Sequence, residues 1–206
     1  MNKTIILIPS RLSAKRLPNK PLLKINNLAI INHVYQKAKL TEIGDVYVAT
    51  GDKEIFKEVT EKGGNCVLTE KEHFTGTDRI FEAFNLLNKK DIDFIMNIQG
   101  DEPDIDINDI KVLDTMMKTN KSRIGTLAGQ IYKDKIYDNE SVVKVKVKES
   151  FNQNSFPLAE NFTRKIKVQD KLNIYHHIGI YCYEVQSLKK FISFKQTKSE
   201  LENKLE

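Results

Sequence analysis

Four basic side chains stand close together near the start of the chain, just after its first apolar run. That run, residues 3–8, is rich in β-branched residues and predicts a strand buried on both faces. The cations that follow are Arg11, Lys15, Arg16 and Lys20, with no acidic residue among them. Because guanidinium and ammonium groups bind phosphate oxygens, this basic loop suits a nucleoside triphosphate. On charge alone, a solvated loop in a lysine-rich protein explains the pattern equally well.

The setting of the basic loop favours a binding site. In an open α/β sheet, ligands bind at the carboxyl ends of the strands, which is where this loop starts. Prolines at 9, 18 and 21 restrict its backbone, and Pro9 is expected to end the strand. The loop contains no glycine, which excludes a Walker A loop and a dinucleotide-binding fingerprint. We therefore expect side chains, rather than backbone amides, to hold the phosphates.

Two carboxylates follow another buried strand, predicted over residues 93–98. Asp101 and Glu102 come directly after Gln99 and Gly100, at the same edge of the sheet as the basic loop. Mg²⁺ takes one or two carboxylates and leaves its other positions to phosphate and water, so these acids suit a magnesium site. The alternative is a turn followed by a helix cap.

A third group of candidates lies on a strand predicted over residues 175–183. Period-two alternation places His177 and Tyr181 on one face, separated by Gly179, where they would face a small polar ligand. The alternative is an ordinary aromatic sheet face, which suits a lone histidine better.

The elements that position these residues predict an α/β fold with a doubly wound, mostly parallel sheet. Strands over 3–8, 45–50, 65–68 and 93–98 alternate with helices over 29–40, 53–62, from about 75, and 108–118. Asp52 is expected to cap the second helix. Residues 142–148 alternate valine and lysine, which predicts an antiparallel or edge strand with Lys144 on its solvated side. Residues 149–173 are polar and predicted to be mostly irregular.

Composition limits the remaining possibilities. The 206 residues suffice for one domain with a sizeable core, and no apolar stretch approaches a membrane span. Cys66 and Cys182 are expected to be buried free thiols of a cytosolic protein. The net charge of +5 comes with lysines interleaved with acids and without an aromatic RNA-binding signature, which argues against a nucleic-acid partner.

Together the clusters resemble the 3-deoxy-manno-octulosonate cytidylyltransferase family. The motifs that carry the resemblance are residues 8–12, 16–21, 75–79, 97–103 and 177–181, in the family's order, and the likeness runs from Thr4 to Glu206. It implies the fold of the nucleotide-diphospho-sugar transferases, with an antiparallel portion in the second half. The implied arrangement is a single domain, 1–206, in which residues of about 140–185 form a homodimer and bind the sugar.

The resemblance also implies a reaction and its residues. CTP and 3-deoxy-manno-octulosonate would give CMP-3-deoxy-manno-octulosonate and pyrophosphate, with Mg²⁺, for lipopolysaccharide biosynthesis. The implied catalytic residues are Arg11, Lys20 and Asp101, with Asp101 also the metal ligand. CTP would be bound by Arg11, Arg16, Lys20, Thr75, Arg79 and Gln99, and the sugar acid by Gln99, Arg164, His177, Tyr181 and Glu206.

The sequence departs from the family pattern in two places. Lys165, Ile166 and Lys167 follow Arg164 where the family has a Pro-Ile-Pro stretch, and the family continues beyond Glu206 to a second metal-binding aspartate. We therefore expect a shortened form of a longer protein that positions Mg²⁺ poorly. Two alternatives stay open: another sugar-acid cytidylyltransferase, of the CMP-sialic acid synthetase type, and a CTP-binding module with little turnover.

Overall fold

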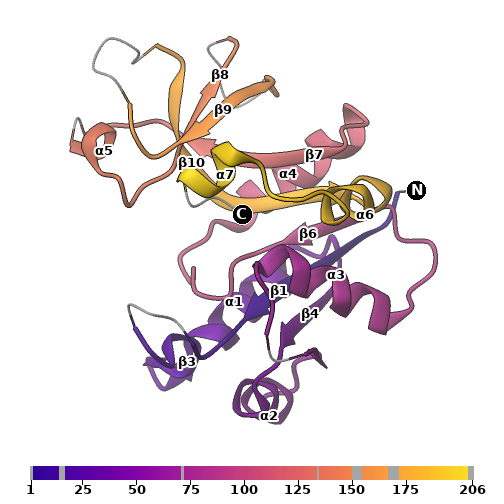
Figure 1. The fold of residues 1–206 in the computed structure, drawn as a ribbon. Helices are drawn as coiled ribbons and strands as arrows, with labels where there is room; N and C mark the ends of the chain where they lie inside the picture. Colours follow the sequence, from indigo (N-terminus) through magenta and orange to yellow (C-terminus); the bar gives the residue numbers. More distant parts are fainter. Residues whose placement is uncertain are drawn as a thin grey trace. The chain divides into compact units, whose positions relative to one another are not determined.

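The computed structural model describes residues 2–13, 17–70, 72–133, 135–149, 155–166 and 172–203 (Figure 1). The chain divides into two compact units. The first is formed by Met1–Gly125 with Ile180–Lys195, and the second by Thr126–Gly179 with Gln196–Leu205. Strands β7 (Ile124–Gly129) and β10 (Ile174–Glu184) contribute residues to both units. None of the helices within these ranges is long and apolar enough to cross a membrane.

The first unit is built on the predicted parallel sheet. Its strands β1 (Thr4–Ser10), β4 (Gly44–Thr50), β5 (Cys66–Leu68) and β6 (Phe94–Asn97) run parallel in the order β5-β4-β1-β6. The last residues of β10 pair with β6 in the antiparallel direction. All seven residues of β1 are buried, as the apolar run predicts. The strand does not end at Pro9: it continues to Ser10, because the φ angle of proline allows extended backbone and Pro9 lies opposite Ala49.

Helices pack on both faces of this sheet, which confirms the doubly wound arrangement. They are α1 (Ile30–Leu40), α2 (Lys53–Glu61), α3 (Gly76–Leu87), α4 (Ile107–Thr119) and α6 (Val185–Ile192). Ile5 and Leu7 of β1 share a buried cluster with Ile80 of α3 and Leu188 of α6. The alternate residues of β1 face the opposite side, where α1 contacts the strand. The segment 20–29 forms η1 (Lys20–Leu22), β2 (Lys24–Ile25) and β3 (Leu28–Ala29).

The second unit is antiparallel, as its alternating pattern predicts. Strand β8 (Lys144–Val147) lies between β9 (Ala159–Thr163) and the first residues of β10, and α5 (Lys135–Asp138) and α7 (Lys198–Asn203) complete the unit. The polar segment 149–173, predicted to be mostly irregular, contains one short strand, β9, which its composition does not reveal. One prediction here is wrong. Lys144 is fully buried instead of solvated, because two backbone carbonyls accept hydrogen bonds from its ammonium group.

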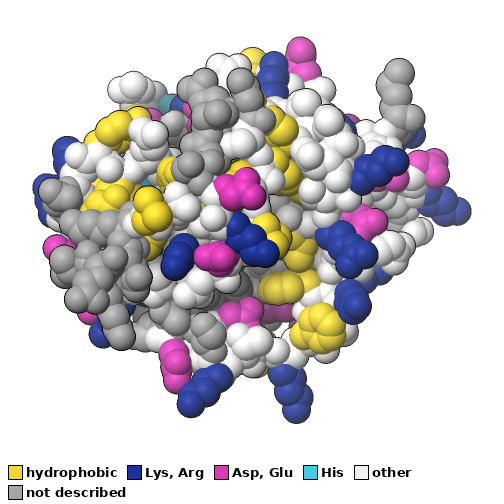
Figure 2. Space-filling view, turned by 90° about the horizontal axis from the view of Figure 1, so that it is seen from above, with side chains coloured by type: hydrophobic (Ala, Val, Ile, Leu, Met, Phe, Trp, Pro, Cys, Tyr) yellow, Lys and Arg dark blue, Asp and Glu magenta, His cyan; other side chains and the backbone are white. Residues whose placement is uncertain are grey.

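The thiols and charges of the chain agree with the sequence-based expectations, except that one thiol is only partly covered. Cys182 is buried and Cys66 is half-buried, and both are free. Burial raises the pKa of Cys66 to about 12, and it also raises the pKa of Cys182. In Figure 2, lysine and arginine side chains are interspersed with acidic ones on the face shown, rather than gathered into one basic surface.

Candidate active site

A cavity of about 200 Å³ lies in the first unit, at the carboxyl ends of β1 and β6. Its walls contain most of the residues that the sequence selects there: Arg11, Lys20, Thr75, Arg79, Gln99 and Asp101. The remaining walls are Pro9, Ser10, Pro21, His73, Gly76 and Gly100. Arg16, Lys15 and Glu206 lie outside the described residues. Arg11 and Asp101, which are 90 positions apart in the sequence, line the same cavity because β1 and β6 are neighbouring parallel strands.

The start of the basic loop is held by the carboxylate of Asp52, which the sequence predicts to cap α2. Asp52 stands at the N-cap of α2, but its side chain makes no cap hydrogen bond, contrary to the prediction. Instead, its Oδ2 accepts a hydrogen bond of 2.8 Å from the backbone amide of Leu12. Sequence proximity suggests capping, whereas the parallel pairing of β1 with β4 brings the start of the basic loop beside Asp52. Asp52 therefore holds the loop that carries Arg11.

Lys20 and Asp101 form an ion pair at the edge of the cavity. Lys20 Nζ donates to Asp101 Oδ2 at 2.8 Å, with side-chain exposures of 31% and 50%. An ion pair this exposed adds little stability, so both groups remain available to a charged ligand. Gly100 lets the loop after β6 approach the end of β1: a Cβ at this position would lie 2.8 Å from the carbonyl oxygen of Pro9.

The N-terminus of α3 forms another wall. Thr75 and Asp78 make a capping box, in which the Thr75 hydroxyl accepts from the Asp78 amide and donates to the Asp78 carboxylate. With its hydroxyl engaged in this way, Thr75 contributes to the site by fixing where α3 begins. The start of a helix favours anions, since its first backbone amides carry partial positive charge.

Arg79 lies deeper in the same wall. It is only 3% exposed, and its Nη1 donates to Thr69 Oγ1 at 2.6 Å and to the carbonyl oxygen of Glu70 at 3.0 Å. Burial lowers the pKa of Arg79, while the nearby carboxylate of Asp52 acts in the opposite direction. A guanidinium ion in this position adds fixed positive charge to the cavity wall.

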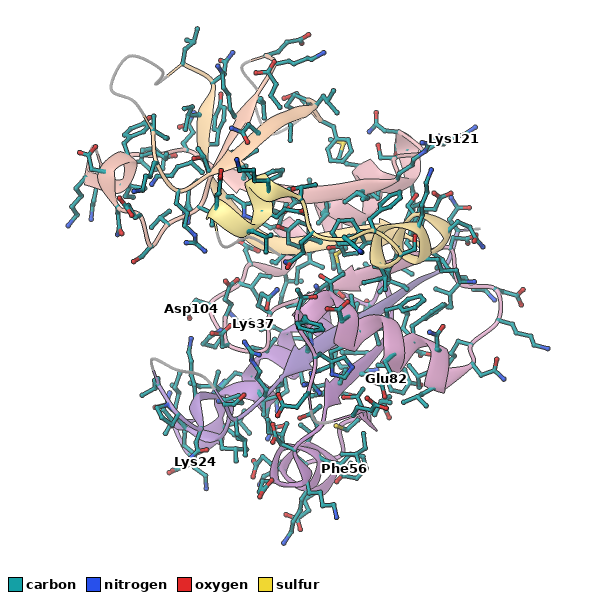
Figure 3. All side chains as sticks on the ribbon, in the orientation of Figure 1. Lys24, Lys37, Phe56, Glu82, Asp104 and Lys121 are labelled. Carbon is teal, nitrogen blue, oxygen red and sulfur yellow. The ribbon has the colours of Figure 1, made fainter. Side chains whose placement is uncertain are left out.

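Sequence reasoning missed His73 and Ser10. His73 Nε2 lies 2.5 Å from Oε2 of Glu82, a residue of α3 labelled in Figure 3, and the other Glu82 oxygen accepts from the Glu70 amide. The Nδ1 of His73 and the hydroxyl of Ser10 are buried without a hydrogen-bond partner within the described ranges. Buried polar atoms normally have a partner, so these two atoms indicate a ligand or a water molecule at the cavity. Neither residue belongs to a spacing pattern that would single it out.

The loop that carries Asp101 is also held from the opposite side. Lys37 of α1 donates to the carbonyl oxygen of Ile105 at 3.1 Å, and Figure 3 labels Lys37 and Asp104 next to each other. This contact ties the segment between β6 and α4 to α1. The position of Asp101 is therefore set by β6 before it and by α1 behind it.

The residues predicted to bind a sugar acid are distributed over both units. Gln99 and Tyr181 belong to the first unit, where Tyr181 lies opposite Asn97 in the sheet and stacks on Tyr183 with ring centroids 5.8 Å apart. Arg164 and His177 belong to the second.

His177 is more enclosed than its predicted role suggests. It is 9% exposed, its Nε2 lies 3.0 Å from the Thr126 hydroxyl, and its ring meets Phe162 edge-on at 5.0 Å. Burial, followed by the charge of His176, lowers the pKa of His177 to about 4. His177 is therefore neutral at pH 7.

Comparison with known proteins gives this geometry a family. The model of a family described as cytidylyltransferase matches residues 5–206. A 3-deoxy-manno-octulosonate cytidylyltransferase from Nitrobacter winogradskyi is 37% identical over 206 residues, which cover 100% of this chain and 80% of the relative. An enzyme of the same name from Thermodesulfovibrio yellowstonii is 38% identical, covering 96% of this chain and 81% of the relative. The chain belongs to the 3-deoxy-manno-octulosonate cytidylyltransferase family.

Solved structures agree with this family assignment. A CMP:2-keto-3-deoxy-manno-octonic acid synthetase complexed with CTP superposes with a TM-score of 0.87 at 31% identity, covering 99% of this chain and 83% of that one. A cytidylyltransferase from Leptospira borgpetersenii superposes with a TM-score of 0.61 at 18% identity, covering 97% of this chain and 68% of its own, which shows the fold alone. The resemblance to the cytidylyltransferase family and the expected α/β fold are therefore confirmed.

The acidic side of the cavity fits the divalent cation that the family resemblance implies. Within the described ranges no group of three or more histidine, cysteine or acidic side chains is arranged to hold a metal ion. Mg²⁺ does not need such a cage, because it accepts one carboxylate and takes substrate phosphates and water for its other positions. Asp101 is half-exposed and lines the cavity together with Arg11 and Lys20, so a magnesium–triphosphate complex suits this donor set.

Proposed function

We propose that this chain transfers the cytidylyl group of CTP to 3-deoxy-manno-octulosonate and so supplies an activated sugar for lipopolysaccharide biosynthesis. The anomeric hydroxyl oxygen of the sugar acid attacks the α-phosphorus of CTP, and the bond between the α- and β-phosphates breaks. Pyrophosphate leaves, and the hydroxyl proton passes to solvent. The observation that carries the proposal is the meeting of Arg11, Lys20, Arg79 and Asp101 in one cavity of a family member.

The cations of the cavity have a defined task in this reaction. Arg11 and Lys20 hold the triphosphate and stabilise the negative charge that develops on the departing pyrophosphate. Arg79 is held by Thr69 and Glu70, so its charge is in place before the nucleotide binds. Arg16 of the same basic loop is proposed to join them. The Ser10 hydroxyl and His73 Nδ1, which have no hydrogen-bond partner among the described residues, are proposed to meet polar atoms of the nucleoside.

Asp101 is proposed to hold Mg²⁺. When bound, this ion supplies charge neutralisation at the phosphates and lowers the pKa of the attacking hydroxyl. Before the nucleotide binds, Lys20 neutralises the Asp101 carboxylate at 2.8 Å. The triphosphate gives Lys20 a new anionic partner, which leaves the Asp101 carboxylate for the cation.

The sugar acid is proposed to contact Gln99, Arg164, His177, Tyr181 and Glu206. Arg164 is the natural partner of its carboxylate, because a guanidinium group binds a carboxylate in a planar, two-point geometry. His177 is neutral at pH 7 and would serve as a shape and hydrogen-bonding element of the site, not as a charge.

The deciding experiment measures pyrophosphate release from CTP and Mg²⁺, with and without 3-deoxy-manno-octulosonate. We expect release only when this sugar acid is present. Release with N-acetylneuraminate in its place would indicate an enzyme of the CMP-sialic acid synthetase type. Binding of CTP without any release would indicate a CTP-binding module and contradict the proposal.

We also propose that the protein acts as a homodimer in the cytoplasm, where CTP is made. The second unit exposes apolar side chains that a partner subunit would cover, with Leu158 at 66% and Leu172 at 79%. Analytical ultracentrifugation of the wild type and of a Leu158→Glu, Leu172→Glu variant tests the dimer. A sedimenting monomer in the wild type would contradict it.

A further inference from the structure

Lys144 is a lysine with no exposed surface. It lies on β8, where its Nζ donates to the carbonyl oxygen of Asn139 at 2.8 Å and to that of Arg164 at 2.7 Å. One acceptor precedes β8 in the chain, and the other follows the end of β9. The ammonium group thus joins two segments that the β-ladder between β8 and β9 does not itself connect.

This burial is unfavourable for the lysine alone. Removing an ammonium ion from water carries a large free-energy cost, which two carbonyl acceptors offset only in part. The pKa of Lys144 is accordingly lowered by burial, while the nearby carboxylate of Asp138 acts in the other direction. An apolar side chain of similar length would avoid that cost, but it would leave the Asn139 and Arg164 carbonyl oxygens without this donor. What the charged group provides at this position is therefore the connection between the turn at Asn139 and the main chain of Arg164.

The contacts around Lys144 converge on one arginine. Nη1 of Arg164 lies 3.2 Å from the carbonyl oxygens of both Glu140 and Ser141, in the turn that Lys144 grips through Asn139. Lys165 adds an exposed ion pair to Glu140 at 3.2 Å. The main chain of Arg164 is thus fixed by Lys144, and its guanidinium group is fixed by the same turn.

We infer that Lys144 is a positioning residue that fixes Arg164 for the carboxylate of the sugar acid. The inference rests on the proposed function, specifically on the role of Arg164. Lys144 acts in two ways: it fixes the main chain from which the Arg164 side chain extends, and its charge adds to the positive potential around the guanidinium group. Both effects favour an acidic sugar, whereas the residues that line the nucleotide cavity all belong to the first unit.

The test is a double-mutant cycle with Lys144→Met and Arg164→Ala, read as KM for each substrate and as kcat. We expect Lys144→Met to raise KM for 3-deoxy-manno-octulosonate by about tenfold, as for the loss of a hydrogen bond to a charged group, and KM for CTP to change by less than about twofold. In the Arg164→Ala background, Lys144→Met should add little further, because its effect passes through Arg164. Lys148→Met is the matched control, since Lys148 is exposed just after the end of the same strand and should leave both KM values unchanged.

Other results would contradict either the positioning role of Lys144 or the assignment of Arg164. Additive effects of the two substitutions, or equal rises in KM for both substrates, would overturn the positioning role. If Arg164→Ala leaves the sugar KM unchanged while pyrophosphate release persists, the assignment of Arg164 fails, and with it the inference, but the proposed reaction stands. If Lys144→Met does not fold, Lys144→Gln retains a donor without the charge. Loss of the fold in both variants would assign Lys144 to the fold alone and overturn the inference.

Discussion

The ammonium group of Lys20 lies 2.8 Å from the carboxylate of Asp101. Lys20 is proposed to bind the triphosphate and Asp101 to bind Mg²⁺, so the two side chains neutralise each other before either ligand binds. A cation without this acid would repel Mg²⁺, and an acid without this cation would repel the triphosphate. Under the proposed function, the pair would therefore prepare the cavity for a magnesium–nucleotide complex rather than for either component alone.

The first prediction concerns the cations of the cavity. Lys20→Ala and Arg11→Ala should each reduce kcat/KM by an amount that corresponds to about 2–4 kcal/mol of transition-state stabilisation. Each substitution removes a positive side chain that stabilises the negative charge of the departing pyrophosphate. Pyrophosphate-release kinetics measure the loss, and thermal unfolding should change little. Lys24→Ala is the control, since Lys24 is exposed and outside the cavity walls. Wild-type turnover in both cavity variants would show that the basic loop is a solvated surface and not a binding site.

The second prediction concerns the metal. Asp101→Asn should abolish most Mg²⁺-dependent turnover while leaving the melting temperature nearly unchanged, because the amide keeps the shape and loses the charge that a hard cation needs. A magnesium titration of the rate measures this effect. Asp104→Asn, an exposed acid of the same segment, should titrate like the wild type. An unaltered titration in Asp101→Asn would show that Asp101 is a turn residue.

The third prediction separates the two tasks that Asp52 might perform. Asp52→Ala should raise KM for CTP and leave KM for the sugar acid unchanged, because it frees the Leu12 amide and loosens the basic loop. Losing one such hydrogen bond to a charged acceptor costs about 1.5–3 kcal/mol. Thr75→Ala is the comparison, since it removes a true helix cap and should cost about 1 kcal/mol of folding stability. If Asp52→Ala lowers the folding stability and leaves KM for CTP unchanged, the carboxylate of Asp52 stabilises α2 and does not hold the basic loop.

The fourth prediction is a pH dependence of stability. The pKa of His177 is about 4 in the folded protein and 6.5 ordinarily, so the unfolded chain binds the proton first as the pH falls. Its contribution to stability is full above pH 6.5, is lost between about pH 6.5 and 4, and amounts to about 3 kcal/mol at most. Urea unfolding of the wild type and of His177→Gln across this range measures the difference. Parallel stability profiles for the two proteins would contradict the prediction.

Strand order explains why the sequence predicts the cavity well. Buried parallel strands read as continuous apolar runs, and whatever follows such a run lies at the ligand-binding edge. This rule alone brings Arg11 and Lys20 into the same cavity as Asp101, although the segments are far apart in the chain. Arg79 follows from its position just after the predicted start of a helix.

The failures come from contacts that only the assembled chain provides. Asp52 has the sequence context of a cap, yet its carboxylate accepts a hydrogen bond from the backbone amide of Leu12, just beyond the end of the neighbouring strand. Lys144 alternates with valines in the manner of a surface strand, but β8 pairs with another strand along each edge, and two backbone carbonyl groups accept hydrogen bonds from the Lys144 ammonium group. Residues 159–163 lack the apolar pattern of a strand, and they form one because their backbone pairs with β8. Local pattern cannot report a partner that arrives from elsewhere in the chain.

The protonation of the two thiols has a practical consequence. Cys66 and Cys182 are the chain's two cysteines, and the raised pKa of each leaves almost no thiolate at neutral pH. Maleimides and iodoacetamides react with the thiolate, so the native protein is close to a cysteine-free background without any substitution. A single cysteine introduced at an exposed position such as Lys24 would accept a fluorophore selectively. The fluorophore would then report nucleotide binding from the segment beyond the basic loop in an otherwise unaltered chain.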